Sequence, residues 1–347
     1  MEFAIGTEPR PEYLSYELAK SARMLVEEIF PVAKGENVLI TADTASDSRV
    51  VDATAQAVYA AGAHPVVIWI EKQPNPCMDP PAPAAAAAKA ANAWIDYTIA
   101  YMLYSPTHRQ AIENGCRYLC YTGMDVDMMV RTIGRQNYTA LSAFTAKIRE
   151  LSTAGKTMRV TNPNGMDLSW EVNKNPPPPG FRREPGKGYS QMLGGQGHAP
   201  AVQDTINGTL VFDGAVWPPE ELGGLRSPIV MTVKDGAITD IKGGAEARTL
   251  ERWLKGFNHS EMFRIAHCSY GFNPGITRIT GRIVEDERVM GSMEYGVGRT
   301  AMGAPSHTDG IVLNPSVYAD GVPIEKEGVY VHPDLVAICK EMGVPGY

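Results

Sequence analysis

The sequence predicts two domains of different class. An α/β domain, Rossmann-like with a mostly parallel sheet, is expected over residues 1–155, and an α+β domain that binds a metal over residues 156–347. In the first part, short apolar runs alternate with segments of helical period, which is typical of βαβ units. In the second part, short strand-like runs are separated by turn residues, which indicates antiparallel sheet. At 347 residues the chain is long enough for two domains, each with its own core.

The elements of the first domain follow from the spacing of its apolar residues. Residues 13–31 have helical periodicity, and residues 38–42 form a short buried strand. A helix over 48–61 and a strand over 65–70 then complete a βαβ unit, whose crossover should be right-handed. The turn after the first strand lacks a Gly-x-Gly fingerprint, so no dinucleotide site is expected there. Further helices are expected at 84–93, 107–114 and 137–153, and further strands at 95–103 and 118–121.

The second domain is expected to begin with a strand at residues 158–161. Residues 173–188 are rich in proline and basic residues, which predicts a surface excursion that is either a plain loop or a lid. Strands are expected at 208–214 and 229–233, and Asp235-Gly236 between two alternating runs is a strong hairpin signal.

Composition excludes several classes of partner. The formal net charge of −7 gives no electrostatic reason to expect binding to nucleic acid or to an anionic membrane. No apolar run reaches the roughly 18 residues that span a bilayer, and the first residues do not resemble a secretory signal. The 5 cysteines are irregularly spaced, which favours reduced thiols. We therefore expect a cytoplasmic protein.

The residues that indicate chemistry are two histidines and an aspartate. On an extended strand, His307 and Asp309 project to the same side, because side chains alternate with period two. His267, from a neighbouring element, completes a set of two histidines and one carboxylate. Such a set holds one divalent metal and leaves coordination positions open for substrate, water or dioxygen. The alternative is that His307 and Asp309 are ordinary polar loop residues and that His267 is a core histidine bonded to a backbone carbonyl.

Three further residues are candidates for an acid or base. Glu246 lies at a strand-to-helix junction, and Glu294 lies in a glycine-rich stretch. For each, the alternative is a solvated carboxylate or one that complements a helix N-terminus. His198 follows a run of glycines and is a candidate active-site loop residue, although a loop histidine without a role is the other interpretation.

Several short motifs resemble the 2,5-dihydroxypyridine 5,6-dioxygenase family, which is distantly related to the aminopeptidase T metallopeptidases. The motifs are residues 207–211, residues 241–247, His267 with the Tyr-Gly-Phe-Asn-Pro segment at 270–274, and His307 with Asp309. The resemblance covers most of the chain loosely and about 140 residues of the C-terminal half more specifically. In the N-terminal half, the best local match is the Ser-Pro pair that follows Tyr104.

The resemblance implies a mononuclear iron site. In the dioxygenases the residues equivalent to His267, His307 and Asp309 bind one Fe(II), whereas the aminopeptidases need additional glutamates and another histidine that this chain lacks. The dioxygenases also have a histidine, implicated in substrate binding or deprotonation, at the position of Tyr104. A tyrosine hydroxyl can donate a hydrogen bond, but its ordinary pKa near 10 makes it a poor base at neutral pH. The substrate of this chain is therefore expected to differ.

Three hypotheses remain open from the sequence. The first is an Fe(II) extradiol-type dioxygenase that opens the ring of a small hydroxylated aromatic or heteroaromatic compound. The second is a metal-dependent hydrolase of an amide or C–N bond, in which the metal activates water; Zn(II) and Mn(II) accept the same ligands as iron. The third is a non-catalytic metal- or ligand-binding protein. In each case we expect a homo-oligomer without nucleic-acid or membrane partners.

Overall fold

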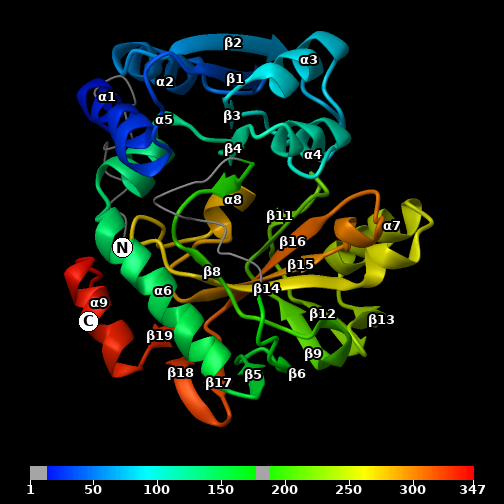
Figure 1. Cartoon of the computed structure of the whole chain (residues 1–347). Helices are drawn as coiled ribbons and strands as arrows, with labels where there is room; N and C mark the ends of the chain where they lie inside the picture. Colours follow the sequence, from blue (N-terminus) through cyan, green and yellow to red (C-terminus); the bar gives the residue numbers. More distant parts are fainter. Residues whose placement is uncertain (1–13, 177–187) are drawn as a thin grey trace, which may run out of the picture. The chain divides into compact units, whose positions relative to one another are not determined.

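The computed structural model describes residues 14–176 and 188–347, which divide into two compact units (Figure 1). The described residues of unit 1 lie within Met1–Tyr138 and Arg182–Leu193, and those of unit 2 within Thr139–Phe181 and Gly194–Tyr347. Unit 1 contains a parallel sheet flanked by helices, and unit 2 combines helices with antiparallel sheets. The predicted fold class is therefore confirmed.

Unit 1 is built on a five-stranded parallel sheet in the order β2-β1-β3-β4-β7. This order, in which the chain first runs outward from β1 and then returns past it, is that of doubly wound α/β folds. The strands are β1 (Asn37–Asp43), β2 (His64–Ile70), β3 (Ala93–Asp96), β4 (Arg117–Cys120) and β7 (Ser190–Met192). Strand β1 is buried over six of its seven residues, as its apolar sequence predicts.

The helices of unit 1 begin where the sequence offers capping side chains. Asp47 accepts a hydrogen bond from the Arg49 amide at the start of α2, and Ser105 accepts one from the His108 amide at the start of α4. The helices are α1 (Ser15–Met24), which continues into a π-helical turn (Leu25–Ile29), α2 (Ser48–Ala60), α3 (Ala82–Ala90), α4 (Pro106–Glu113) and α5 (Val126–Met129), with a second π-helical turn at Val130–Gly134.

The strand expected over residues 95–103 is wrong beyond Asp96. The Asp96 carboxylate, fully buried at the end of β3, accepts hydrogen bonds from the Thr98 amide (3.1 Å), the Thr98 hydroxyl (2.7 Å) and the Met102 amide (3.0 Å). These bonds fold the following residues back around the carboxylate. Local side-chain bonding therefore replaces the extended conformation that the apolar residues suggested.

The loop that follows ends in a strained turn at Tyr104, whose φ of 69° lies in the left-handed region that side chains disfavour. The Tyr104 amide donates to Nδ1 of His108 (3.2 Å), and Nε2 of the same ring lies 2.7 Å from the Ser190 hydroxyl. Since Nδ1 accepts, the proton of the neutral ring is on Nε2, which donates to Ser190. His108 therefore holds the turn in place from both of its nitrogens.

Unit 2 contains two antiparallel sheets. The six-stranded sheet has the order β11-β10-β16-β15-β14-β8, and the eight-stranded sheet has the order β13-β12-β9-β6-β5-β17-β18-β19. In the first are β8 (Gln196–His198), β10 (Ala215–Trp217), β11 (Gly223–Gly224), β14 (Ile265–Gly271), β15 (Ser292–Val297) and β16 (Thr308–Leu313). In the second are β5 (Thr157–Thr161), β6 (Asp167–Glu171), β9 (Asn207–Phe212), β12 (Ile229–Lys234), β13 (Ala237–Lys242), β17 (Ser316–Ala319), β18 (Val322–Lys326) and β19 (Val329–Tyr330).

The predicted hairpin is confirmed. Strands β12 and β13 pair around Asp235 and Gly236, whose φ angles of 50° and 73° are both positive, as a tight hairpin turn requires. The helices of this part of the chain are α6 (Tyr138–Ala154), α7 (Ala245–Gly256), α8 (Ile283–Asp286) and α9 (Pro333–Glu341), with short 3-10 turns at Gln203–Thr205, Ser260–Phe263 and Thr300–Met302.

Helix α6 packs within unit 2, although the sequence placed it at the end of the N-terminal domain. The centroid of the Phe144 ring lies 4.5 Å from that of Phe272 and 4.9 Å from that of Tyr330, and Lys147 forms an ion pair with Asp334 at the start of α9. The boundary near residue 155, as a division between independently folding domains, stays a prediction.

Two further expectations concern the proline-rich segment and membrane-spanning helices. Residues 177–187, which form most of the proline-rich excursion, lie outside the described residues, so both the loop and the lid interpretations stay predictions. Across the two described ranges, the helices are too short or too polar for any of them to cross a membrane.

Candidate metal centre

The candidate metal ligands lie on the central strands of the six-stranded sheet. In its register, His267 of β14 is opposite Gly296 of β15, and Gly296 is opposite Asp309 of β16. Residues that face one another across antiparallel strands project to the same side, so His267 and Asp309 share one face of the sheet. His307 immediately precedes β16 and is two residues from Asp309. We call this side of the sheet the site face.

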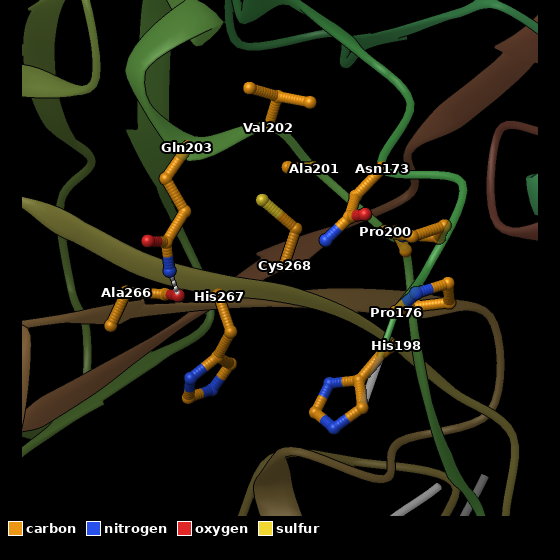
Figure 2. A pocket seen from close by; sticks show the side chains of 11 residues that line it. Asn173, Pro176, His198, Pro200, Ala201, Val202, Gln203, Ala266, His267 and Cys268 are labelled. Atoms are coloured by element: carbon orange, nitrogen blue, oxygen red, sulfur yellow. Dashed lines mark hydrogen bonds between the residues drawn. The ribbon is translucent and has the colours of Figure 1, made fainter. Parts of the chain in front are cut away.

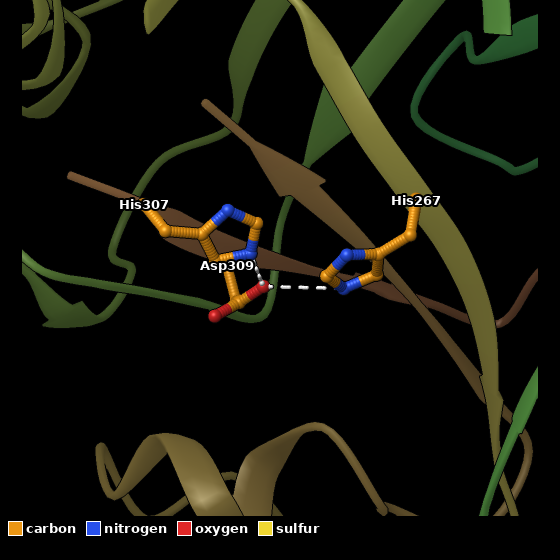
Figure 3. Close-up of side chains that lie close together, drawn as sticks. All are labelled: His267, His307 and Asp309. Atoms are coloured by element: carbon orange, nitrogen blue, oxygen red, sulfur yellow. Dashed lines mark hydrogen bonds and ion pairs between the residues drawn. The ribbon is translucent and has the colours of Figure 1, made fainter. Parts of the chain in front are cut away.

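The three side chains converge, as the sequence predicts (Figure 3). Asp309 Oδ1 lies 3.0 Å from His307 Nε2 and 3.5 Å from His267 Nε2. One ligand atom from each residue can be chosen so that all of them lie within 4.8 Å of one another. The two imidazole rings stack with their centroids 5.1 Å apart. This arrangement brings two nitrogens and one carboxylate oxygen to a common point.

The orientation of His307 is set by a second hydrogen bond. Its Nδ1 lies 2.8 Å from the Gly298 carbonyl oxygen, which can only accept. Nδ1 therefore carries a proton, and Nε2, which is hydrogen-bonded to Asp309 Oδ1 at 3.0 Å, is the nitrogen that would bind a metal after losing its own proton. A histidine whose outer nitrogen donates to a carbonyl is the usual arrangement of a metal ligand.

Glu294 is a fourth group on the site face, two residues before Gly296 on β15. Its side chain is fully buried, and its Oε1 atom lies 2.9 Å from His267 Nε2. Gln196 of β8 donates to the other oxygen, Oε2, at 3.1 Å. The sequence named Glu294 as an acid or base near the metal, and the structure brings it to the cluster.

The electrostatics of the cluster are those of buried opposite charges. Burial alone lowers the pKa of His267, but the nearby Glu294 and Asp309 carboxylates outweigh it and raise that pKa well above its ordinary value. Burial likewise lowers the pKa of His307, but the neighbouring Asp309 carboxylate raises it by more, so the net shift is upward. Burial also raises the pKa of Asp309, but the two neighbouring imidazoles lower it by more, so the net shift is downward. For Glu294, burial raises the pKa, and the net shift is upward.

The donor set fits a divalent cation. Two carboxylates are buried beside two imidazoles, and Glu294 Oε1 faces His267 Nε2 at 2.9 Å. Buried carboxylates are costly unless positive charge faces them, and a divalent cation would supply that charge. The backbone also makes room for the imidazole: a Cβ added at Gly296 would lie 2.3 Å from His267 Cε1 and 2.7 Å from its Nε2. His267, His307 and Asp309 are therefore the residues that would hold a metal ion.

His198 also lies on the site face, because β8 places it opposite Ser269 of β14. Its Nδ1 is 3.4 Å from the Ser269 hydroxyl, and its ring is 6.0 Å from that of His267. Burial, with a contribution from His267, lowers the pKa of His198 to about 4. The sequence expected this histidine in a loop; it instead ends a short strand, which fixes it beside His267.

A pocket of about 490 Å³ adjoins this edge of the sheet. It is lined by His198, His267 and Cys268 together with residues 199–203. The two imidazoles extend to one side of β14, and Cys268 Sγ points to the other (Figure 2). Adjacent strand residues face opposite ways, so His267 and Cys268 do not form a nucleophile pair.

Two sequence candidates take other positions. Glu246 lies in the first turn of α7, where its carboxylate accepts hydrogen bonds from the Arg226 amide (2.9 Å) and from the Ser227 amide (3.0 Å) and hydroxyl (2.7 Å). Its oxygens therefore tie down the loop before β12, and the structure does not bring it into the metal cluster. Tyr104 belongs to unit 1 and occupies the strained turn held by His108.

Sequence reasoning missed two residues that contact the centre. Gly296 lies in the glycine-rich stretch that the sequence singled out, but only the strand register shows that it faces His267. Gln196 is far from Glu294 in sequence, and a lone glutamine among glycines carries no signal of its own. To find Gly296 and Gln196 from the sequence, the register between strands that are distant in sequence would have to be known.

The fold and the site together define a class of protein: a doubly wound α/β unit followed by an antiparallel unit with a candidate centre of two histidines and one carboxylate. Residues 26–332 match the 2,5-dihydroxypyridine 5,6-dioxygenase family. Because that match spans most of the chain, the chain belongs to this family and is an enzyme of the dioxygenase type.

Individual relatives agree with the family. A 2,5-dihydroxypyridine 5,6-dioxygenase of Pseudomonas putida is 25% identical over 251 residues, which are 67% of this chain and 69% of that protein. The solved structure of 2,5-dihydroxypyridine dioxygenase from Pseudomonas putida KT2440 has a TM-score of 0.74 at 19% identity, covering 94% of this chain and 99% of that one. Wild-type AmpT from Thermus thermophilus has a TM-score of 0.64 at 15% identity, covering 92% and 100%. At these identities the two structures support the fold alone.

Proposed function

We propose that this enzyme is a metal-dependent dioxygenase that opens the ring of a small hydroxylated aromatic or nitrogen-heteroaromatic compound, with Fe(II) as its metal. The observation that carries the proposal is the convergence of His267, His307 and Asp309 within 4.8 Å on one face of the sheet. Two histidines and one carboxylate with open positions are the ligand set of non-haem Fe(II) oxygenases. When bound, the metal would supply a place where substrate oxygens and dioxygen meet.

The protein residues have separate roles in this proposal. His267, His307 and Asp309 hold the metal, and the Gly298 carbonyl keeps the His307 Nε2 lone pair directed at it. Glu294 and His198, on the same face, are the groups that can accept a hydrogen bond or a proton from a substrate hydroxyl. Tyr104 stands where the related dioxygenases are expected to have a histidine, and we propose it as a hydrogen-bond donor to the substrate rather than a base.

Apolar side chains beside the ligands support an aromatic substrate; Trp217, Ile279 and Leu313 are partly exposed, and Ala215, Ile283 and Ile311 are buried. Trp217 of β10 is directly opposite Asp309 in the sheet register, so its side chain is on the site face. Next to it, Ile311 and Leu313 continue along β16 on the same face, and a cluster of Ala215, Ile283 and Ile279 packs against them. The site face is thus polar on one side of Asp309 and apolar on the other. A flat ring with hydroxyl groups matches that division.

A metal-dependent hydrolase is the second candidate, and one observation favours it. Glu294 Oε1 lies 2.9 Å from His267 Nε2, a candidate ligand atom, which is where a base would take a proton from a metal-activated water. In that function the metal would be Zn(II) or Mn(II), and the bond cleaved would be an amide or another C–N bond.

The two candidates are separated by metal analysis and oxygen uptake. Protein purified without oxygen would be analysed for iron, zinc and manganese, and oxygen consumption measured with 2,5-dihydroxypyridine, other dihydroxypyridines and catechols. Iron together with uptake on a member of the panel supports the dioxygenase. Zinc or manganese, no uptake, and release of amine from amide substrates would establish the hydrolase instead. Light scattering on the same sample tests the homo-oligomer, which stays a prediction.

A further inference from the structure

A buried chain of polar side chains leads from Glu294 away from the metal ligands. Gln196 Nε2 donates to Glu294 Oε2 (3.1 Å), and an Arg288 nitrogen donates to Gln196 Oε1 (2.9 Å). A second nitrogen of Arg288 donates to Glu287 Oε2 (2.7 Å) and to the Val284 carbonyl (2.6 Å). Arg288 and Glu294 are both fully buried. Gln196, which connects them, is half-buried.

The direction of each hydrogen bond in this chain is determined. A guanidinium has donors only, so the oxygen of the Gln196 amide must face Arg288. Its NH2 group must then face Glu294, and Glu294 Oε2 must accept. That leaves Oε1 as the oxygen that faces the candidate metal ligands, 2.9 Å from His267 Nε2. Arg288 thus decides, through one amide, which oxygen of Glu294 is presented to the metal centre.

Stability alone does not explain the arrangement. Burying an arginine removes a strongly hydrated cation from water, and an ion pair such as Arg288–Glu287 commonly contributes no more than well-packed apolar side chains would. By contrast, residues that orient the groups around a metal commonly change metal affinity or activity by about 10- to 100-fold when replaced. The Arg288–Glu287 pair is connected to Glu294 through the single amide of Gln196, which corresponds to a role in orienting a group beside the candidate metal site.

We propose that Gln196 and Arg288 are positioning residues that hold Glu294 with Oε1 turned to the metal centre, where it accepts a hydrogen bond from a hydroxyl of the bound substrate. This inference rests on the proposed function, because it assigns the substrate hydroxyl a partner. Neither positioning residue touches the substrate; each acts through Glu294.

The test is a double-mutant cycle between Gln196→Leu and Glu294→Gln. Since Gln196 acts through Glu294, kcat/KM should fall by on the order of 10- to 100-fold in either single variant, and the double variant should be no worse than Glu294→Gln alone. Gln191→Leu is the control: Gln191 is a fully buried glutamine of unit 1, and it donates to the backbone carbonyl of Ile29. Its kcat/KM should equal that of the unaltered enzyme. Losses that simply multiply in the double variant would overturn the positioning role.

A second measurement does not need turnover. The visible absorption spectrum of the protein loaded with Co(II) reports the surroundings of the metal in the absence of substrate. Gln196→Leu should reproduce the spectral change caused by Glu294→Gln, and the double variant should add nothing; Gln191→Leu should leave the spectrum unchanged. An unaltered spectrum in Gln196→Leu, with a clear change in Glu294→Gln, would refute the inference even if ring cleavage is established. Coupled spectra in a protein that cleaves no aromatic ring would instead refute the proposed function and leave the orientation of Glu294 standing.

Discussion

Gly296 and His267 face each other across the β14–β15 pair, so closely that the imidazole occupies the space a Cβ at position 296 would need. The shortest distance from that Cβ would be 2.3 Å, to His267 Cε1. The glycine is therefore required by the position of the ring and not by its own backbone conformation. The candidate metal centre therefore depends on the absence of a side chain at position 296.

Gly296→Ala should displace His267 and lower the metal affinity by at least about 10-fold, a loss typical for residues that orient ligands. Metal content after dialysis against a weak chelator measures the effect. Gly256→Ala is the matched control, because no heavy atom of the described residues lies within 4 Å of a Cβ at that position on α7. A fully loaded Gly296→Ala protein would show that the ring is not a ligand in the position described.

Alanine at His267, His307 or Asp309 should each remove most of the metal while leaving the fold intact. Each substitution deletes one of three ligands, and the remaining two cannot hold a divalent ion against a competing chelator. Elemental analysis gives the metal content, and circular dichroism checks the fold. Asp309→Asn adds a variant of nearly the same shape without the charge. Normal occupancy in all three alanine variants would dispose of the site.

Tyr104 should determine the choice of substrate and not the binding of metal. Tyr104→Phe should weaken transition-state stabilisation by about 1–3 kcal/mol if the hydroxyl bonds a buried substrate group. Tyr104→His should improve kcat/KM for 2,5-dihydroxypyridine relative to the natural substrate, because it restores a titratable base. Metal content should be unchanged in both. Unaltered kcat/KM in Tyr104→Phe, with no oxygen uptake on any aromatic compound, would favour the hydrolase.

The turn at Tyr104 gives a related expectation about stability. Glycine adopts a φ of 69° without the strain that a tyrosine incurs there. Tyr104→Gly should therefore unfold at the same temperature as the unaltered protein, or a higher one, while losing substrate discrimination. Differential scanning calorimetry and a substrate panel measure the two effects. A large drop in unfolding temperature would mean that the tyrosine is structural.

His108 should make unit 1 less stable as the pH falls. Burial, assisted by Arg109, lowers the pKa of His108 to about 4, whereas an unfolded histidine titrates near 6.5. Above about pH 6.5 both states are neutral and stability is complete; between 6.5 and 4 only the unfolded state takes up the proton, so stability is lost as the pH decreases. Full loss of this contribution amounts to about 3 kcal/mol.

The matched variant for this pH dependence is His108→Asn, which keeps an acceptor for the Tyr104 amide but does not titrate. As the pH is lowered from 7 to 4, the unfolding temperature of the unaltered protein should fall by more than that of the variant. Parallel curves over that range would rule out a buried neutral His108.

Much of the fold could be predicted because its signals are local. Apolar runs and turn residues located β1, α2, β2 and the β12–β13 hairpin within a few residues. The prediction of a strand beyond Asp96 was wrong because the buried Asp96 carboxylate accepts hydrogen bonds from the backbone amides of Thr98 and Met102. Side-chain bonding of this kind has no periodic pattern to reveal it.

The residues of the candidate site likewise fall into those that local sequence could predict and those that it could not. His307 and Asp309 could be paired from their spacing on one strand, and His267 from its residue type and context. Gln196 and Arg288 could not be found, because their connection to Glu294 exists only when β8, β15 and the segment after α8 are brought together. Contacts between distant strands depend on register, which a single sequence does not state.

Strand register sets the spacing of positions 267, 294, 296 and 309, and no loop conformation enters into it. Exchange of the side chains at these positions would change the donor set while the backbone stays where it is. A descendant of this chain could therefore acquire a different metal or a different reaction by point substitution, without insertion or deletion. In such a sheet, the chemistry is freer to diverge than the framework that carries it.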